Sequence, residues 1–180
     1  MSRGTLLQIL LPLVALGVVV LVLRARGFSP RRELALYAPA ARPLLWWVGA
    51  FIALAVVEEV AGRALGVPPV VPWGSRYEPL ERVVRAGGMI AVAPVVEELL
   101  FRGLMFTRLS TTRLRPVGAV IVIAVLFAAL HVQYGWLDLA FVLVDGLFFG
   151  AARAATGTVV VPLVCHMLGN AYAALERLGP

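Results

Sequence analysis

The chain has 180 residues, of which 61% are hydrophobic and only 14% are charged, and its mean hydropathy is +0.93. So much apolar surface excludes a soluble globular protein, and at about 20 apolar residues per span the chain has room for roughly six membrane helices and no separate soluble domain. The net charge of +6 comes from sixteen arginines and no lysine. These arginines fall mainly at the ends of apolar runs and accompany no groove-reading motif, so we expect no nucleic-acid binding.

Six apolar segments predict an all-α, polytopic transmembrane bundle of about six helices. They cover residues 5–23, 44–61, 87–107, 116–132, 137–154 and 157–175. The first segment is long enough to span and lacks a small-residue cleavage pattern, so it is expected to be an uncleaved anchor helix. The composition shifts only at 65–85, where prolines and aromatic residues predict a segment at the membrane interface, with a short amphipathic helix over 78–85.

The distribution of arginines predicts the orientation of these segments. Alternate loops place nine on one side, namely Arg24, Arg26, Arg31, Arg32, Arg42, Arg108, Arg113, Arg115 and Arg153, and six on the other, namely Arg3, Arg63, Arg76, Arg82, Arg85 and Arg177. The bias favours a cytoplasmic loop after the first helix and hence an outside N-terminus. The arginine-only, Ala- and Val-rich composition is typical of a GC-rich bacterial genome, so the inner membrane of a bacterium is the expected location.

The third segment carries three charges that need an explanation. A charge inside a span costs about 2.5 to 3.5 kcal/mol, so it indicates function unless a structural partner accounts for it. Glu98 and Arg102 are four residues apart, with the acid on the N-terminal side, which favours an internal ion pair. Glu97 points about 100° away from Glu98 on a helix and is expected to face the bundle interior without a local partner.

The fourth and sixth segments hold the remaining polar side chains that carry chemistry. His131 lies at the end of the fourth segment, and His166 and Asn170 lie in the sixth. These are the only two histidines and the only asparagine of the chain. Because His166 and Asn170 are four residues apart, both are expected to project from one helix face into one cavity.

Other polar residues receive structural interpretations. Glu58, Glu59 and Arg63 repeat the Glu-Glu-x-x-x-Arg spacing at the end of the second segment, where snorkelling to water favours an interfacial role. Cys165 is adjacent to His166 in sequence, but neighbouring helix positions diverge by about 100°, so a buried apolar thiol is expected rather than a nucleophile. Asp145 is expected either to pair with Arg102 or to line the cavity.

The ordered polar residues resemble the motifs of the CPBP family of intramembrane peptidases. The three motifs, each on its own apolar segment and about 35 residues apart, are Glu97-Glu98-x-x-x-Arg102, Phe127-x-x-x-His131 and His166-x-x-x-Asn170. Gly146-x-x-x-Gly150 and the Thr-Gly-Thr sequence at 156–158 also resemble the family pattern. The family includes type II CAAX prenyl endopeptidases and bacterial members linked to bacteriocin processing or self-immunity. The resemblance covers about residues 87–172 and implies N-terminal helices with an interfacial segment at 1–86 and a CPBP-like catalytic core at 87–175.

The resemblance implies an endopeptidase that hydrolyses a peptide bond of a membrane-associated or lipidated peptide. Glu97 is the expected general base, His131 helps to hold and deprotonate the water, and His166 and Asn170 form the oxyanion hole. Glu98 and Arg102 are expected to support this site. No cofactor is favoured, because no His-Glu-x-x-His helix is present. The alternative is a catalytic zinc ion held by Glu97, His131 and His166.

Two functions outside catalysis are also compatible with the sequence. A small transporter would bury glutamate, histidine and asparagine in the same way, and a non-catalytic immunity or scaffold protein would keep the fold without needing Glu97. The partners expected in every case are membrane lipids, with a peptide or lipidated protein as substrate if the chain is a peptidase. Replacement of Glu97 separates these hypotheses.

Overall fold

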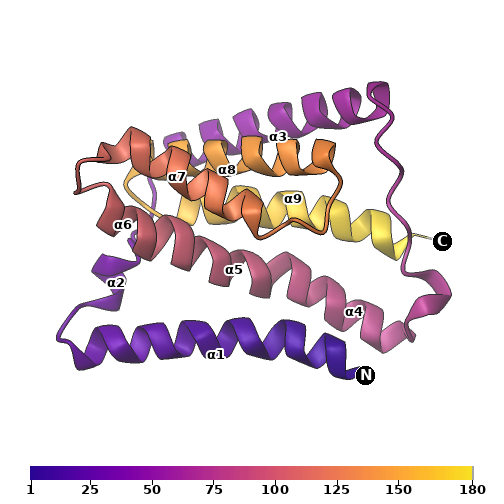
Figure 1. Ribbon diagram of the computed structural model, residues 1–180, viewed down its shortest axis with the longest axis horizontal. Helices are drawn as coiled ribbons and strands as arrows, with labels where there is room; N and C mark the ends of the chain where they lie inside the picture. Colours follow the sequence, from indigo (N-terminus) through magenta and orange to yellow (C-terminus); the bar gives the residue numbers. More distant parts are fainter. Residues whose placement is uncertain (180) are drawn as a thin grey trace.

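The computed structural model describes residues 1–179, and these residues are helical with no strand (Figure 1). The α-helices are α1 (Arg3–Ala25), α2 (Pro30–Glu33), α3 (Ala41–Ala64), α4 (Pro79–Gly87), α5 (Ala93–Glu98), α6 (Phe106–Leu109), α7 (Arg115–Ala129), α8 (Trp136–Thr156) and α9 (Val160–Leu178). Each of the six predicted apolar segments lies largely within a helix, so the all-α prediction is confirmed. Among the described residues, α1, α3 and α8 are long and apolar enough to cross a membrane by themselves.

The third predicted segment is part of one continuous helical run from α4 to α6. Two wider π-type turns, Gly88–Val92 and Leu99–Met105, join α4 to α5 and α5 to α6. Such turns interrupt the regular hydrogen-bond ladder and are frequent at functional sites. The second of them contains Arg102 and directly follows Glu98, so the helix is widest where its buried charges lie.

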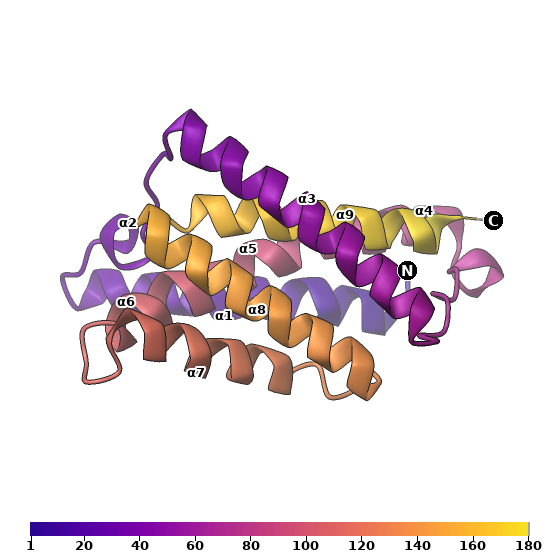
Figure 2. The ribbon, with the colours of Figure 1, turned by 90° about the horizontal axis from the view of Figure 1, so that it is seen from above.

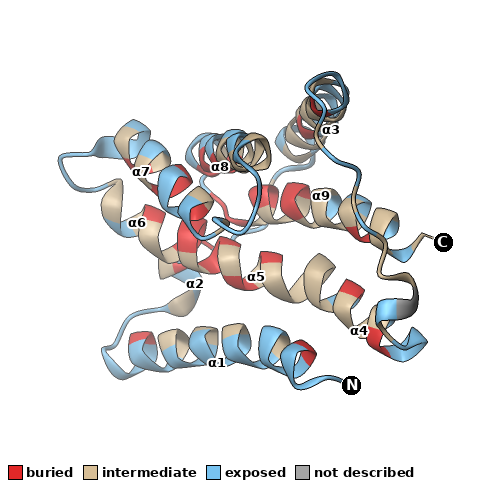
Figure 3. Ribbon diagram, turned by 45° about the vertical axis from the view of Figure 1, so that its right-hand side comes forward, coloured by how far each residue is buried: buried red, intermediate tan, exposed pale blue. Residues whose placement is uncertain are grey.

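The helices run back and forth between two ends of the molecule (Figures 1 and 2). The N-terminus, the α3–α4 connection at 65–78, the α7–α8 loop at 130–135 and the described C-terminal residue lie at one end, here named the terminal end. The loops at 26–40, 110–114 and 157–159 lie at the opposite end. Buried positions concentrate on the facing surfaces of α5, α7, α8 and α9, whereas α1 lies to one side and is largely exposed (Figure 3).

Two glycines allow α8 to approach α7 closely. A Cβ atom added to Gly146 would lie 3.2 Å from the Cα atom of Ala124, and one added to Gly150 would lie 2.8 Å from Cγ1 of Val120. Small residues four apart are the usual means of close helix packing in membranes, because they let backbones approach. The Gly146-x-x-x-Gly150 sequence therefore serves the close packing of α8 against α7.

The first turn of α1 is fastened to α4 by a polar cluster at the terminal end. The hydroxyl groups of Ser2 and Thr5 donate to Oε1 of Glu81 at 2.6 and 2.5 Å, and Nη1 of Arg85 donates to the Thr5 hydroxyl at 2.6 Å. Glu81 lies before the apolar part of its helix begins. The hydrogen bonds from Ser2 and Thr5 lower the pKa of this carboxyl from 4.5 to about 2.

Replacing Gly146 with valine is expected to destabilise the protein by about 1 to 3 kcal/mol, because the new side chain collides with the α7 backbone. Thermal unfolding in detergent measures the effect. Gly49→Val in α3 is the matched control, because a Cβ atom at Gly49 meets nothing within 4 Å. Equal losses for the two variants would contradict the packing argument.

Acidification is expected to loosen α1 from α4. Because the folded pKa of Glu81 is lowered to about 2, its stabilising contribution is full above the unfolded pKa of 4.5 and is lost as the pH falls towards 2. As the pH is lowered between these two values, the thermal stability of Glu81→Gln in detergent should fall less steeply than that of the parent protein. Glu78→Gln, at an exposed position at the start of the same helix, should keep the parental pH dependence.

Candidate active site

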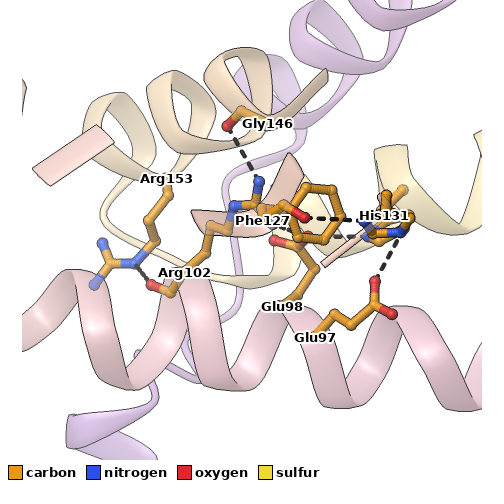
Figure 4. Close-up of polar contacts among 8 residues, drawn as sticks. Glu97, Glu98, Arg102, Phe127, His131, Gly146 and Arg153 are labelled. Carbon is orange, nitrogen blue, oxygen red and sulfur yellow. Dashed lines mark hydrogen bonds and ion pairs between the residues drawn. The ribbon is translucent and has the colours of Figure 1, made fainter. Parts of the chain in front are cut away.

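A buried ion pair lies at the centre of the helical core. Nη1 of Arg102 donates to Oε1 of Glu98 at 2.9 Å, and both side chains are 0% exposed. Nη2 of Arg102 donates to the main-chain oxygen of Gly146 in α8 at 3.1 Å, and the guanidinium lies over the ring of Phe127, 4.4 Å from its centroid (Figure 4). The ion pair expected from the sequence is present. Arg102 also connects α8 and α7 to the helical run from α4 to α6.

His166 lies between the two carboxylates of the first motif. Its Nδ1 is 3.0 Å from Oε1 of Glu98, and its Nε2 is 3.7 Å from Oε2 of Glu97. The ring stacks on Phe149 with centroids 5.0 Å apart, and Phe127 approaches it edge-on at 5.8 Å. The carboxylates at its two nitrogens and the two aromatic rings packed against it hold the imidazole in one orientation.

The hydrogen bond to Glu98 determines which nitrogen of His166 carries a proton. A carboxylate paired with Arg102 can only accept, so Nδ1 of His166 is the donor. Nε2, which faces Glu97, is then an acceptor in the neutral ring and a donor only when the ring carries both protons. Glu98 therefore does more than neutralise Arg102, because it also orients His166.

His131 lies just beyond the C-terminal end of α7, and its ring orientation is also determined through Nδ1. This nitrogen lies 2.9 Å from the main-chain oxygen of Phe127, which can only accept, so Nδ1 is the donor. Nε2 of the neutral ring is left as an acceptor. His131 is half-buried, and its ring packs 4.9 Å from that of Phe127.

Asn170 lies one turn after His166 on α9, as predicted. Its Nδ2 donates to the main-chain oxygen of Met89 at 2.8 Å, in the first of the two wide turns. A side-chain amide has two N–H donors, so one donor remains for another acceptor. The bond to Met89 holds the amide group in place from the opposite helix.

A cavity of about 1040 Å³ brings several of these residues together. His131, His166 and Asn170 all lie on its wall, and so do the aromatic residues Phe127 and Phe149. Glu97 is not among the lining residues, and its 29% exposed side chain contacts the cavity residues at His166. Three of the four predicted site residues therefore share the cavity wall. The fourth, Glu97, contacts the imidazole of His166 but does not itself line the cavity.

The two acids of the second Glu-Glu-x-x-x-Arg sequence both line the cavity but differ in their partners. Glu59 pairs with Arg63 at 2.6 Å on the exposed surface, as an interfacial role predicts. Glu58 makes no such pair, and it lines the cavity together with Asp145 of α8. Among the described residues, Oε1 of Glu58 and Oδ1 of Asp145 are buried without a hydrogen-bond partner. Asp145 thus lines the cavity rather than pairing with Arg102.

Three contributors to the site were not recognised in the sequence. Phe127 belongs to a motif, but its role as a surface for both histidines and Arg102 appears only in the structure. Phe149 is one of many apolar residues of α8, and nothing in the pattern singles it out. Arg153 donates through Nε to the main-chain oxygen of Arg102 at 2.9 Å, a contact between residues 51 positions apart.

A cysteine nucleophile and a bound metal ion are the two other chemistries that the sequence raised. Cys165 is buried with 0% exposure, which agrees with the expected apolar thiol. Within residues 1–179, no three His, Cys, Asp or Glu side chains are placed so that they could hold a metal ion. The alternative zinc ligands Glu97, His131 and His166 therefore do not form a ligand set in this arrangement.

Comparison with known proteins identifies the family. The model of the Rce1-like type II CAAX prenyl endopeptidases matches residues 79–172, more than half of the chain. The chain belongs to this family. An Escherichia coli protein described as an uncharacterized 24.3 kDa protein is 33% identical over 132 residues, which cover 68% of this chain and 58% of that protein. No solved structure matches the chain significantly.

The matched region contains the three polar motifs and the helices that carry them. It begins at the start of α4 and ends two residues after Asn170. The family match therefore includes Glu97, His131 and His166, whereas α1 and α3 lie outside it. This chain spans less than two thirds of the length of its Escherichia coli relative.

Replacing Arg102 with methionine is expected to destabilise the protein by about 3 to 5 kcal/mol, because Glu98 is left as an unpaired buried charge. Arg63→Met is the matched control, because it removes an ion pair of the same spacing whose side chains are 76% and 36% exposed. That variant should lose less than about 1 kcal/mol. Thermal unfolding in detergent compares the two, and similar losses would contradict the role given to burial.

Proposed function

We propose that this protein is an intramembrane endopeptidase that hydrolyses a peptide bond of a membrane-associated or lipidated peptide. The observation that carries the proposal is the Glu97–His166–Glu98 cluster beside a large cavity, in a chain of the CAAX endopeptidase family. Carboxylates and imidazoles within reach of one another are the groups that activate water for hydrolysis. A protein that only needed these residues for folding would have no use for the adjoining cavity.

Water activation is assigned to Glu97 and His131. Nε2 of neutral His131 is an acceptor at the cavity wall, because its Nδ1 is committed to Phe127. A water molecule bound there can give up its proton to the imidazole, or to the carboxylate of Glu97 beside His166, while its oxygen attacks the scissile carbonyl. The carboxylate also compensates the charge that His131 gains if it accepts the proton.

Stabilisation of the tetrahedral oxyanion is assigned to His166 and Asn170. Asn170 keeps one amide N–H after its bond to Met89, and it is held in place before the reaction begins. His166 can donate from Nε2 only when it carries both protons, and the carboxylates on its two sides compensate that charge. In this mechanism Glu98 is a positioning residue that acts through His166.

The cavity gives the proposal its substrate class. Its lining combines aromatic residues with acids and arginines near the terminal end. An extended peptide segment that emerges from a bilayer presents both apolar and polar groups, and a volume of about 1040 Å³ can hold several of its residues. A lipidated peptide is included in this class, since the lipid would remain in the surrounding bilayer.

Glu97→Gln and His131→Ala are expected to reduce peptide hydrolysis by about 100-fold or more, because each removes a group assigned to proton transfer. Purified protein in detergent, tested against a library of peptides, measures the loss. Glu78→Gln is the control, because Glu78 is exposed at the start of α4 and does not line the cavity. The control should keep parental activity, and all variants should keep parental thermal stability.

Three results would overturn the assignment. Full activity in Glu97→Gln would exclude Glu97 as the base, and a phenotype that persists without measurable hydrolysis would favour a scaffold or immunity protein. Activity lost after chelation and restored only by zinc would favour the zinc-dependent alternative. Retained activity after thorough metal removal would favour hydrolysis by Glu97 and His131 alone.

A further inference from the structure

We propose that the cavity opens on the extracytoplasmic face of the membrane, so that the substrate segment reaches the site from outside the cytoplasm. The orientation rests on the charges at the two ends of the molecule, and the statement about the substrate rests on the proposed peptidase function. The two parts are separable, because the orientation of the cavity can be measured without any hydrolysis.

The two ends of the molecule differ strongly in charge. The arginines at or near the opposite end are Arg24, Arg26, Arg31, Arg32, Arg42, Arg108, Arg113 and Arg115. The only acidic side chain in these segments is Glu33, which pairs with Arg108 at 2.8 Å. Arg153, counted with this side in the sequence, is turned inward to the Arg102 main chain. The opposite end is therefore almost uniformly cationic.

The terminal end has no such excess. Its arginines are Arg3, Arg63, Arg76, Arg82, Arg85 and Arg177, and its acids are Glu58, Glu59, Glu78, Glu81, Asp138 and Glu176. Several of these cations already have partners in the chain. Arg63 pairs with Glu59, and Arg85 bonds to Thr5 and lies over the Tyr77 ring at 4.0 Å. The arginines of the terminal end are thus balanced by an equal number of acids, whereas most arginines of the opposite end have no acid near them in the sequence.

Cationic loops stay on the cytoplasmic side during insertion, because arginine-rich short loops are not readily translocated. The loops at the opposite end are short, so this rule applies to them directly. Anionic lipid headgroups in the cytoplasmic leaflet would also attract the arginines near that surface. The opposite end is therefore assigned to the cytoplasm and the terminal end to the outside.

The cavity lies toward the terminal end. Its wall is formed by the last turns of α3, the end of α7, the first half of α8 and the last turns of α9. The lining also includes residues 67–70 of the α3–α4 connection, Tyr134 of the α7–α8 loop and Arg177 in the last turn of α9. No lining residue comes from the loops at 26–40, 110–114 or 157–159 of the described chain. The polar residues at the wall therefore face the extracytoplasmic compartment.

This orientation restricts the substrates that can reach His131 and His166. A peptide bond must lie in a segment that has crossed the membrane or that enters it from outside. A segment exposed only to the cytoplasm would meet the cationic end, where the described structure offers no part of this cavity. Translocated membrane peptides and extracytoplasmic lipidated peptides are the substrate classes that remain.

Single cysteines placed on the two sides of α7 test the orientation. Thr111 in the α6–α7 loop and Gln133 in the α7–α8 loop are both exposed, and Tyr134 lies at the cavity wall. The parent protein is the blank, because its only cysteine, Cys165, is buried. Intact bacterial cells that express Thr111→Cys, Gln133→Cys or Tyr134→Cys are treated with a charged, membrane-impermeant maleimide. The total amount of reactive thiol is measured after detergent is added.

Gln133→Cys and Tyr134→Cys are expected to react at least about tenfold faster than Thr111→Cys in intact cells, because the apolar bilayer excludes a charged reagent. All three should react similarly in detergent. Faster reaction of Thr111→Cys would overturn the proposal, and equal reaction of Thr111→Cys and Gln133→Cys would overturn a single orientation. The same labelling in a Glu97→Gln background keeps the test independent of peptidase activity.

Discussion

The structure depends on one buried ion pair, between Glu98 and Arg102, from which the other polar contacts of the core extend. Two charges with 0% exposure in an apolar core need further hydrogen bonds besides their own pairing, and among the described residues only Oε2 of Glu98 and Nε of Arg102 in this pair lack one. Glu98 satisfies His166, and Arg102 reaches the Gly146 main chain. The pair thus joins three helices that are far apart in sequence, and we regard positioning rather than added stability as its main effect.

The backbone around this pair is adapted to it. The π-type turn at Leu99–Met105 widens the helix at Arg102, and Arg153 donates to the main-chain oxygen of that residue. Gly146 serves in two ways, because its missing side chain lets α8 approach α7 and its carbonyl oxygen receives Arg102. A close helix contact and a buried guanidinium therefore require the same residue, which explains why a glycine lies at that position of α8.

Local contacts could be predicted from the sequence, and distant ones could not. Helical periodicity was enough to pair Glu98 with Arg102 and to place His166 and Asn170 on one face, since residues four apart are neighbours on any helix. The contact between His166 and Glu98 joins positions 68 residues apart and depends on how α9 rotates against α5. Glu58 shows the same limit. It is the first acid of the second Glu-Glu-x-x-x-Arg sequence, as Glu97 is of the first, but only the structure shows that α3 places it in the cavity wall.

The two histidines differ in what their Nδ1 atoms bind, and this difference decides what each can do. Both rings donate from Nδ1, so both present Nε2 to the site. His131 donates to a neutral main-chain carbonyl, which leaves the ring an acceptor that can take a proton from water. His166 donates to a carboxylate and faces a second one, so a doubly protonated ring is compensated there and can serve as a donor. The proposed division between base and oxyanion donor therefore follows from the acceptors at Nδ1, and Glu98 is the residue that distinguishes the two rings.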